Sequence, residues 1–428
     1  MAVRLVISLA TIGTLCIHFA APGAGGQSEE RNPAPRTADA CQAAKLRLFA
    51  PAWRNIGEQT PEECAKKFTV IFGHLDPKPF HQGNPEIKCF KYVLGPYVAK
   101  GMLKVLPPEA IAHGREGNVV KARSWSNWLI VPDNPRWLDT MTSVTRRLMD
   151  SDFDGLFTDS MGTAPVDSNY VITKAVNPNT NKPYTKGEWI EAECVMLGAV
   201  REALPKGKLL ILNGLGHGER YWTEPESDSP RPLLQYVDGA MAEMIWRMPN
   251  SRLTDWPSPE RWMKDVRMIQ DVEKRGLMGF WWTKCWSDGN TSNNEPNADK
   301  LVPQWRRFAL VSYLLAAGPH SYFNFDTMKN DKPKSNAAEY FPEYDTTPGE
   351  ATGPMEELGK SGVYGRPFSN GAVVVNPTDK PVKGARLPWT DLEEKGGSFV
   401  IAGGGAAKMT LDVPAHAGLI LTLSGKSR

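Results

Sequence analysis

Two short segments decide the fold: FDGLFTD at residues 153–159 and VDGAMAE at residues 237–243. Each begins with Asp-Gly after one apolar residue, continues through a mostly apolar run and ends in a carboxylate, Asp159 or Glu243. Short apolar runs of this kind are typical of strands buried on both faces of a parallel sheet. We therefore expect the two segments to deliver two acids to the same edge of one parallel sheet.

The rest of the N-terminal three quarters alternates strand and helix signals. Eight strand candidates are found at residues 46–52, 68–72, 87–93, 153–159, 208–213, 238–243, 277–283 and 320–325. Eight strands with crossovers between residues 45 and 326 match the size of a (β/α)8 TIM barrel. An open doubly wound sheet would carry a Gly-rich phosphate loop after its first strand, whereas residues 51–54 read Pro-Ala-Trp-Arg. The fold class is therefore α/β, with a (β/α)8 barrel.

Several of the intervening helices have clear boundaries. One begins at Asn134-Pro135, and another at Thr185, which forms a capping box with Glu188. A third begins at Ser258-Pro259 and ends at Gly276. A fourth is expected over residues 303–317, since Gly318-Pro319 is a strong helix stop.

After residue 326 the sequence changes character. Residues 327–360 are rich in Pro, Gly, Asn and charged residues, which predicts a connector. Residues 361–428 contain short alternating runs at 371–375, 398–402, 408–413 and 418–423, separated by turn residues. This pattern predicts a small C-terminal antiparallel β-sandwich.

The N-terminus has the features of a secretory signal. Arg4 precedes an apolar run over residues 5–21, and small residues offer cleavage sites up to residue 26. We expect residues 1–26 to be removed, residues 27–44 to form a tail, and the protein to be exported to the periplasm or beyond. A membrane anchor is the alternative, but the run is short for a span. Cys41 and Cys64 could form one disulfide in such a compartment.

Composition excludes several classes of partner. The chain has 50 Lys and Arg against 48 Asp and Glu, a formal charge of +2, which gives no case for nucleic acid or an anionic membrane surface. It has seven His and no Cys-x-x-Cys or Cys/His cluster, which argues against metal. No cofactor is expected, the partner is expected to be a carbohydrate, and the oligomeric state stays open.

In a barrel the active site lies at the carboxyl ends of the strands. Glycoside cleavage needs two carboxyl groups there, one to protonate the leaving oxygen and one to attack or to activate water. Asp159 and Glu243 are the candidate catalytic pair, and Glu219 is the reserve proton donor. The candidate substrate-binding residues at the other strand ends are Trp53, Tyr97, Asn213, Trp281, Lys284, Asn324 and Asp326.

Each acid also has a plainer interpretation. Asp159 could cap a helix or tie a loop, whereas Glu243 lies among apolar neighbours, where an unpaired carboxylate is costly. Asp154 and Asp238 come at the strand starts, the stability face of a barrel, and are expected to be structural. Trp281 and Trp282 point to opposite faces of one strand, so at least one of them is a packing residue.

The two acidic strands and the C-terminal tail together resemble uncharacterised TIM-barrel glycoside hydrolases, nearest the hypothetical glycosyl hydrolase family 15. The tail pattern is carried by Tyr344-Asp345, Gly349, Gly353, residues 364–371, residues 375–378 and residues 414–421. By analogy with α-galactosidase-like barrels, the resemblance implies that Asp159 is the nucleophile and Glu243 the general acid/base. Those relatives usually have Asp at the second position, so the role of Glu243 departs from their pattern.

Taken together, the sequence predicts an exported glycoside hydrolase that acts on O-glycosidic bonds of a poly- or oligosaccharide, with retention of configuration favoured over inversion. The main competing hypothesis is a non-catalytic carbohydrate-binding protein on a degenerate barrel. A metal-dependent hydrolase and a structural or adhesion protein are two less favoured interpretations. The sugar, the linkage and endo or exo action stay open.

Overall fold

The centre of the protein is an eight-stranded parallel sheet. The computed structural model describes residues 46–52, 56–149, 151–249, 251–285, 295–327, 338–346 and 348–424. The strands, in sheet order, are β1 (Phe49–Ala52), β2 (Val70–Gly73), β3 (Lys88–Leu94), β6 (Gly155–Asp159), β9 (Leu209–Asn213), β10 (Gly239–Ala242), β11 (Met278–Lys284) and β12 (Ser321–Asp326). Each predicted strand corresponds to one of these eight.

The sheet closes on itself. All neighbouring strands pair in parallel, and a parallel bridge between Leu48 and Phe323 links the first strand to the last. The side-chain amide of Asn324 also donates to the carbonyl of Phe49 at 2.6 Å. The predicted (β/α)8 barrel is therefore confirmed.

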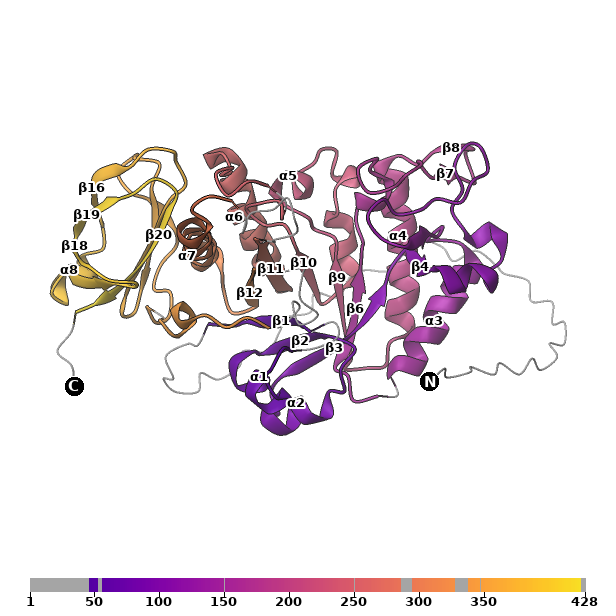
Figure 1. Ribbon diagram of the computed structural model, residues 1–428, viewed down its shortest axis with the longest axis horizontal. Coiled ribbons are helices and arrows are strands. Elements are labelled where there is room, and N and C mark those ends of the chain that lie inside the picture. The colour runs from indigo at the N-terminus through magenta and orange to yellow at the C-terminus, as the bar shows by residue number, and fades with distance from the viewer. Residues whose placement is uncertain are drawn as a thin grey trace, which may run out of the picture. The chain divides into compact units, whose positions relative to one another are not determined.

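Helices cover the outside of the barrel (Figure 1). They are α1 (Pro61–Lys67), α2 (Lys78–Gly83), α3 (Pro135–Met149), α4 (Lys186–Ala203), α5 (Gly218–Tyr221), α6 (Pro259–Lys274) and α7 (Ala298–Ala316). The capping box at Thr185 is formed as predicted, with Glu188 as its reciprocal partner. Helix α7 begins at Ala298, earlier than expected, and therefore holds Pro303 in its interior.

A cluster of large side chains fills the half of the barrel interior that is nearer to the strand starts. Nine buried side chains form it: Phe49, Val70, Phe72, Phe90, Phe157, Ile211, Met241, Phe280 and Trp282. Their rings pack closely, with centroids 4.5 Å apart for Phe72 and Phe157. This half of the interior is thus a packed core, and the polar side chains farther along the same strands lie between it and the carboxyl ends of the strands.

The two Asp-Gly units tie the strand starts together, as predicted. The carboxylate of Asp154 accepts the backbone N–H of Cys89 on β3 at 2.8 Å, and that of Asp238 accepts the N–H of Leu210 on β9 at 2.8 Å. The glycine that follows each Asp is required for space. A Cβ at Gly155 would lie 2.0 Å from a neighbouring backbone oxygen, and one at Gly239 would lie 2.5 Å from another.

Two long insertions, which the sequence patterns did not reveal, follow β3 and β6. The first contains the antiparallel pair β4 (Tyr97–Ala99) and β5 (Asn127–Leu129), and the second contains β7 (Val176–Asn177) and β8 (Lys182–Pro183). The two insertions share a core of their own that includes Val120, Leu129 and Val171. Because they follow strand ends, they lie at the face where the active site was expected.

The C-terminal part is built of antiparallel sheets. One has the order β13 (Glu356–Glu357), β14 (Tyr364–Phe368), β15 (Gly371–Asn376), β20 (Ala417–Leu423), β17 (Ser398–Ile401) and β18 (Ala406–Lys408), and a second pairs β16 (Val382–Arg386) with β19 (Thr410–Val413). They share a second core. A short helix, α8 (Thr390–Glu394), interrupts the predicted all-β pattern.

Helix α7 links this part to the barrel. The helix contacts β15 and β20, and Figure 1 shows it between the barrel strands and the yellow C-terminal strands. The guanidinium of Arg366 donates to the carbonyls of Leu314, Leu315 and Ala317 at the end of this helix. The C-terminal sheets therefore pack against the barrel.

Several N-terminal predictions lie outside the described residues. These are the signal segment, the tail, the single-pass anchor and Cys41; the predicted partner of Cys41, Cys64, is a buried free thiol. Among the described helices, none is both long and apolar enough to span a membrane.

Candidate active site

A cavity of about 470 Å³ opens at the carboxyl ends of the barrel strands. Strands and both insertions contribute to its wall. The lining residues include His74, Tyr92, Tyr97, Trp125, Asn127, Asp159, Tyr170, Asn213, Arg220, Glu243, Trp282 and Lys284. A volume of this order is typical of a small-molecule site, and the mixture of acids, amides and aromatic rings makes it suited to a polar ligand.

Asp159, the last residue of β6, is held by three donors. The hydroxyl of Tyr92 donates to Oδ2 at 2.5 Å, while the side-chain amide of Asn213 and the N–H of Ser160 donate to Oδ1 at 2.7 and 2.8 Å. Burial, and to a lesser degree the charge of Glu243, raise the pKa of Asp159, while the three hydrogen bonds oppose the rise. The carboxylate is therefore fixed in orientation but costly to ionise.

Glu243, immediately after β10, has a different environment. Its carboxylate accepts a hydrogen bond from Lys284 Nζ at 3.0 Å, and 29% of its side chain is exposed. The ammonium of Lys284 also lies 3.6 Å from the centroid of the Trp282 ring. The buried ammonium of Lys284 thus holds Glu243, whose carboxylate stays accessible from the cavity.

The two acids share one cavity because of the sheet order. Only β9 separates β6 from β10, and Asn213, at the end of β9, contacts Asp159 directly. The charge of Glu243 raises the pKa of Asp159. Two carboxyl groups in different environments within one cavity are the arrangement that glycoside hydrolysis uses.

The structure brings five of the predicted site residues to the cavity wall, and their roles stay predictions. These are Asp159, Glu243, Asn213, Lys284 and Tyr97. Trp53 lies outside the described residues.

Four predicted residues do not line the cavity. Trp281 points toward the helices, where its indole N–H donates to Ser321 Oγ at 3.3 Å, and its neighbour Trp282 faces the cavity instead. Asn324 and Asp326 are buried. Glu219, the reserve proton donor, has 49% of its side chain exposed and lies within 4 Å of His217 and Arg261.

The cavity also contains residues that the sequence reasoning missed. Tyr92 lies on a predicted strand, but nothing in the sequence marks its contact with Asp159. His74 follows β2, and its ring meets that of Tyr92 edge-on, 5.3 Å between centroids. Trp125 and Tyr170 come from the two insertions, which have no regular hydrophobic period. The run Ser-Trp-Ser-Asn-Trp at residues 124–128 was the one available signal, an aromatic-rich polar segment between strands.

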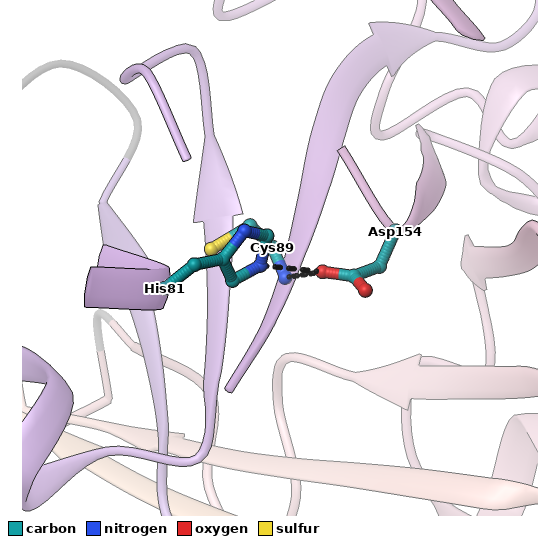
Figure 2. A group of neighbouring side chains, drawn as sticks. All are labelled: His81, Cys89 and Asp154. Atoms are coloured by element: carbon teal, nitrogen blue, oxygen red, sulfur yellow. Dashed lines mark hydrogen bonds and ion pairs between the residues drawn. The ribbon is translucent and has the colours of Figure 1, made fainter. Parts of the chain in front are cut away.

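Within the part of the chain that the structure describes, His81, Cys89 and Asp154 form a group that could hold a metal by residue type, with ligand atoms within 4.8 Å of one another. Figure 2 shows the Asp154 carboxylate aimed at the His81 ring and at the backbone N–H of Cys89. The Asp154 carboxylate is therefore already hydrogen-bonded within the protein, just as the Asp238 carboxylate is hydrogen-bonded to Leu210 and Arg201. Burial and the Asp154 charge raise the pKa of the Cys89 thiol to about 12, which disfavours the thiolate that a metal needs. We assign this group to strand pairing, at the opposite end of the barrel from the cavity.

Comparison with solved structures finds barrels of carbohydrate-active enzymes at low identity. The glycoside hydrolase domain of PelA from Pseudomonas aeruginosa is 13% identical, with a TM-score of 0.31 over 56% of this chain and 94% of that one. The noncanonic maltogenic α-amylase AmyB from Thermotoga neapolitana is 12% identical, with a TM-score of 0.46 over 88% and 98%. A variant of the GH36 α-galactosidase AgaA from Geobacillus stearothermophilus is 11% identical, with a TM-score of 0.42 over 89% and 56%.

Comparison with family models is more informative. No curated protein sequence matches this chain. A model described as hypothetical glycosyl hydrolase family 15 matches residues 136–372, which is more than half of the chain and includes both cavity acids. The chain therefore belongs to the hypothetical glycosyl hydrolase family 15 and is a glycoside hydrolase built on a (β/α)8 barrel.

Proposed function

We propose that the protein cleaves O-glycosidic bonds of a poly- or oligosaccharide with retention of configuration, with Asp159 as nucleophile and Glu243 as general acid/base. One observation carries the proposal: both acids line one cavity, and the charge of one raises the pKa of the other. In a retaining mechanism the first acid forms a covalent glycosyl intermediate, and the second protonates the leaving oxygen and then activates water.

The hydrogen bonds of Asp159 fit the role of nucleophile. A nucleophile must be ionised and must point at the anomeric carbon of the sugar. Three hydrogen-bond donors surround its carboxylate, and they oppose the rise in the pKa of Asp159 that burial and the charge of Glu243 cause. The same three contacts restrict the rotation of the carboxylate on the cavity wall.

Glu243 fits the role of acid/base because it is accessible. A general acid/base must lose a proton and regain one in each catalytic cycle. The exposed part of Glu243 lies on the cavity wall, where water can exchange that proton. Lys284 Nζ, at 3.0 Å, can stabilise the carboxylate after it has given up its proton.

Aromatic side chains support a sugar ligand. Trp125 lines the cavity although it is 58% exposed, so its indole offers a flat apolar face to a ligand that enters. Tyr97 and Tyr170 contribute further rings to the wall, and Asn127 contributes an amide. Such rings pack against the C–H faces of sugars, while amide and charged groups bind hydroxyls. The cavity wall thus fits a neutral poly- or oligosaccharide.

Export is the second part of the proposal. It rests on the apolar segment at residues 5–21 and the small residues that follow. N-terminal sequencing of the protein recovered outside the cytoplasm of a bacterial host tests it. A first residue near Gln27 supports the proposal, whereas an intact N-terminus contradicts it.

The catalytic assignment is tested by release of reducing ends from a panel of poly- and oligosaccharides. We expect wild-type turnover on at least one member, and a loss of at least about a thousandfold in Asp159→Asn and in Glu243→Gln. Asp154→Asn, at the opposite end of β6, is the matched control and should keep its activity. Near-normal turnover in either cavity variant contradicts the assignment. Glycan binding by calorimetry without release of reducing ends would favour a binding protein instead.

A further inference from the structure

The loops that follow the two cavity acids share a feature that the proposed mechanism does not use. The third residue after each acid has a left-handed backbone: Gly162 follows Asp159 with φ 79°, and Trp246 follows Glu243 with φ 62°. The N–H of each donates to a buried carboxylate on the next long helix. Gly162 donates to Glu193 Oε2 on α4 at 2.7 Å, and Trp246 donates to Asp265 Oδ2 on α6 at 2.9 Å.

Glu193 connects to Asp159 through a short chain of contacts. It holds Gly162, and a Cβ at Gly162 would lie 2.5 Å from the carbonyl oxygen of Gly214, so this loop is pressed against the end of β9. The neighbouring N–H of Met161 donates to the carbonyl of Asn213 at 2.8 Å. Two of the three donors to Asp159, the Asn213 amide and the Ser160 N–H, therefore belong to segments that this loop fixes.

Asp265 connects to Glu243 in a similar way. Its two oxygens accept the N–H of Gly218, after β9, at 2.5 Å and the N–H of Trp246, after β10, at 2.9 Å. The next residue, Arg247, donates to the carbonyl of Lys284 at 2.8 Å, and Lys284 is the ion-pair partner of Glu243. Asp265 thus ties together two loops and, through them, the surroundings of Glu243.

Both carboxylates are fully buried, and their hydrogen bonds explain why an acid is present. Each accepts N–H groups on both oxygens: Glu193 takes Gly162 and the indole of Trp189, and Asp265 takes Gly218 and Trp246. An amide offers one acceptor and one donor, so it would leave one N–H facing another. Burial raises the pKa of Asp265 to about 7 and that of Glu193 well above its usual range. Burying an acid costs free energy, and each of these two buried acids fixes a loop that has a left-handed residue.

We infer that Glu193 and Asp265 are positioning residues for Asp159 and Glu243: each fixes the loop that follows one catalytic acid and thereby aims that acid into the cavity. Neither lines the cavity, so neither is a catalytic residue. The inference rests on the proposed function, because it takes Asp159 and Glu243 as the catalytic pair.

Crystal structures and kinetics of Glu193→Ala and Glu193→Gln test the first half. We expect Glu193→Ala to break the contact between Asn213 and Asp159, and to lower kcat at least about tenfold with KM within about twofold. Glu193→Gln keeps one acceptor and should recover part of the kcat. Trp189→Phe is the matched control: it removes the other hydrogen bond of Glu193 but leaves Gly162 bound, so it should lower the melting temperature without moving Asp159.

The second half uses Asp265→Ala, Asp265→Asn and the control Trp262→Phe. The control removes another buried hydrogen bond of α6, from the Trp262 indole to Ser312 Oγ at 2.8 Å, which involves neither loop. We expect Asp265→Ala to displace Glu243 or Lys284 and to lower kcat, Asp265→Asn to do so less, and the control to leave both in place.

Three outcomes separate the failure of the inference from the failure of the proposed function. If the Ala and conservative variants keep Asp159 and Glu243 in place, the two buried acids act on stability alone and the inference is wrong. The same follows if the control variants lose kcat as strongly as the Ala variants do. If Asp159→Asn keeps full turnover, the proposed function fails, whatever the positions in the crystals. Should an Ala variant not fold, the Gln and Asn variants and the crystallographic positions decide.

Discussion

Strands β6 and β10 have the same sequence pattern, with Asp-Gly at the start and an acid at the end. The two starts have equivalent contacts in the structure, whereas the two ends have different ones. At the starts, Asp154 and Asp238 make equivalent bonds, each to a backbone N–H of the preceding strand in the sheet. At the ends, three donors contact the Asp159 carboxylate, whereas Lys284 contacts that of Glu243, whose side chain is 29% exposed. The repeated aspartates at the strand starts serve sheet pairing, and the different environments at the strand ends suit the two chemical roles that we propose for the acids.

This difference matters because the two steps of a retaining reaction need unlike acids. A rigid, ionised group suits attack, and an accessible group suits proton transfer. The β6 acid is a short Asp within reach of the Tyr92 hydroxyl and the Asn213 amide, whereas the β10 acid is a longer Glu that reaches Lys284. The longer Glu at the end of β10 therefore reaches a different partner from the shorter Asp at the end of β6.

The largest expected effect separates the two roles. Asp159→Ala and Glu243→Ala should each lose at least about a thousandfold in turnover of a natural glycan. With an activated aryl glycoside and added azide, Glu243→Ala should form a glycosyl azide of the substrate's own configuration, because Asp159 still makes the covalent intermediate. Asp159→Ala should give the opposite configuration, since azide replaces the missing nucleophile. Chromatography and NMR determine the configurations of the azide products. If the two variants gave each other's expected configuration, the roles of Asp159 and Glu243 would be reversed.

A smaller effect tests Asp154 and Asp238, the equivalent aspartates at the starts of β6 and β10. Asp154→Ala and Asp238→Ala each remove the acceptor of a strand N–H, which should lower the free energy of unfolding by about 1–3 kcal/mol. Turnover at a temperature where both variants are folded should stay within about twofold of wild type. Urea unfolding and an initial-rate assay measure the two quantities. A large loss of turnover in a folded variant would mean that the strand starts also serve the active site.

The smallest effect concerns the pH dependence of Asp159. The Tyr92 hydroxyl lowers the pKa of Asp159 against the rise caused by burial and by Glu243. Asp159 must be ionised to attack, so activity falls as the pH drops through its pKa. Tyr92→Phe raises that pKa further, and the acid limb of the kcat/KM profile should move to higher pH. Tyr97→Phe is the control, because Tyr97 also lies on the cavity wall but is not one of the three donors to Asp159, and it should leave the limb in place.

Much of the barrel could be predicted because its strands carry a strong local signal. Each of the eight is a short apolar run, and the shared rim of a parallel sheet then places Asp159, Asn213, Glu243 and Lys284 together. The alternation of a strand does not say which face is inside, however. The predicted binding residue Trp281 does not line the cavity, whereas its neighbour Trp282 does. The register of β11 on β12, which pairs Trp282 with Asn324, is set by long-range contacts that no local pattern encodes.

The rest of the site could not be predicted because it depends on loops. Trp125 and Tyr170 reach the cavity from insertions whose core forms only when the two insertions meet. Tyr92 gives no sign in sequence that its hydroxyl bonds to an acid 67 positions away. Glu193 and Asp265 read as ordinary polar positions on amphipathic helices, and only the tertiary structure shows that both are buried against loop N–H groups.

The most direct test of the central claim is the configuration of the first sugar released, followed by ¹H NMR at the anomeric proton before mutarotation mixes the anomers. An Asp159 nucleophile with a Glu243 acid/base predicts that the new reducing end has the same anomeric configuration as the bond that was cut. Release of the opposite anomer would mean that water attacks directly, with the second acid as its base, and would contradict the account.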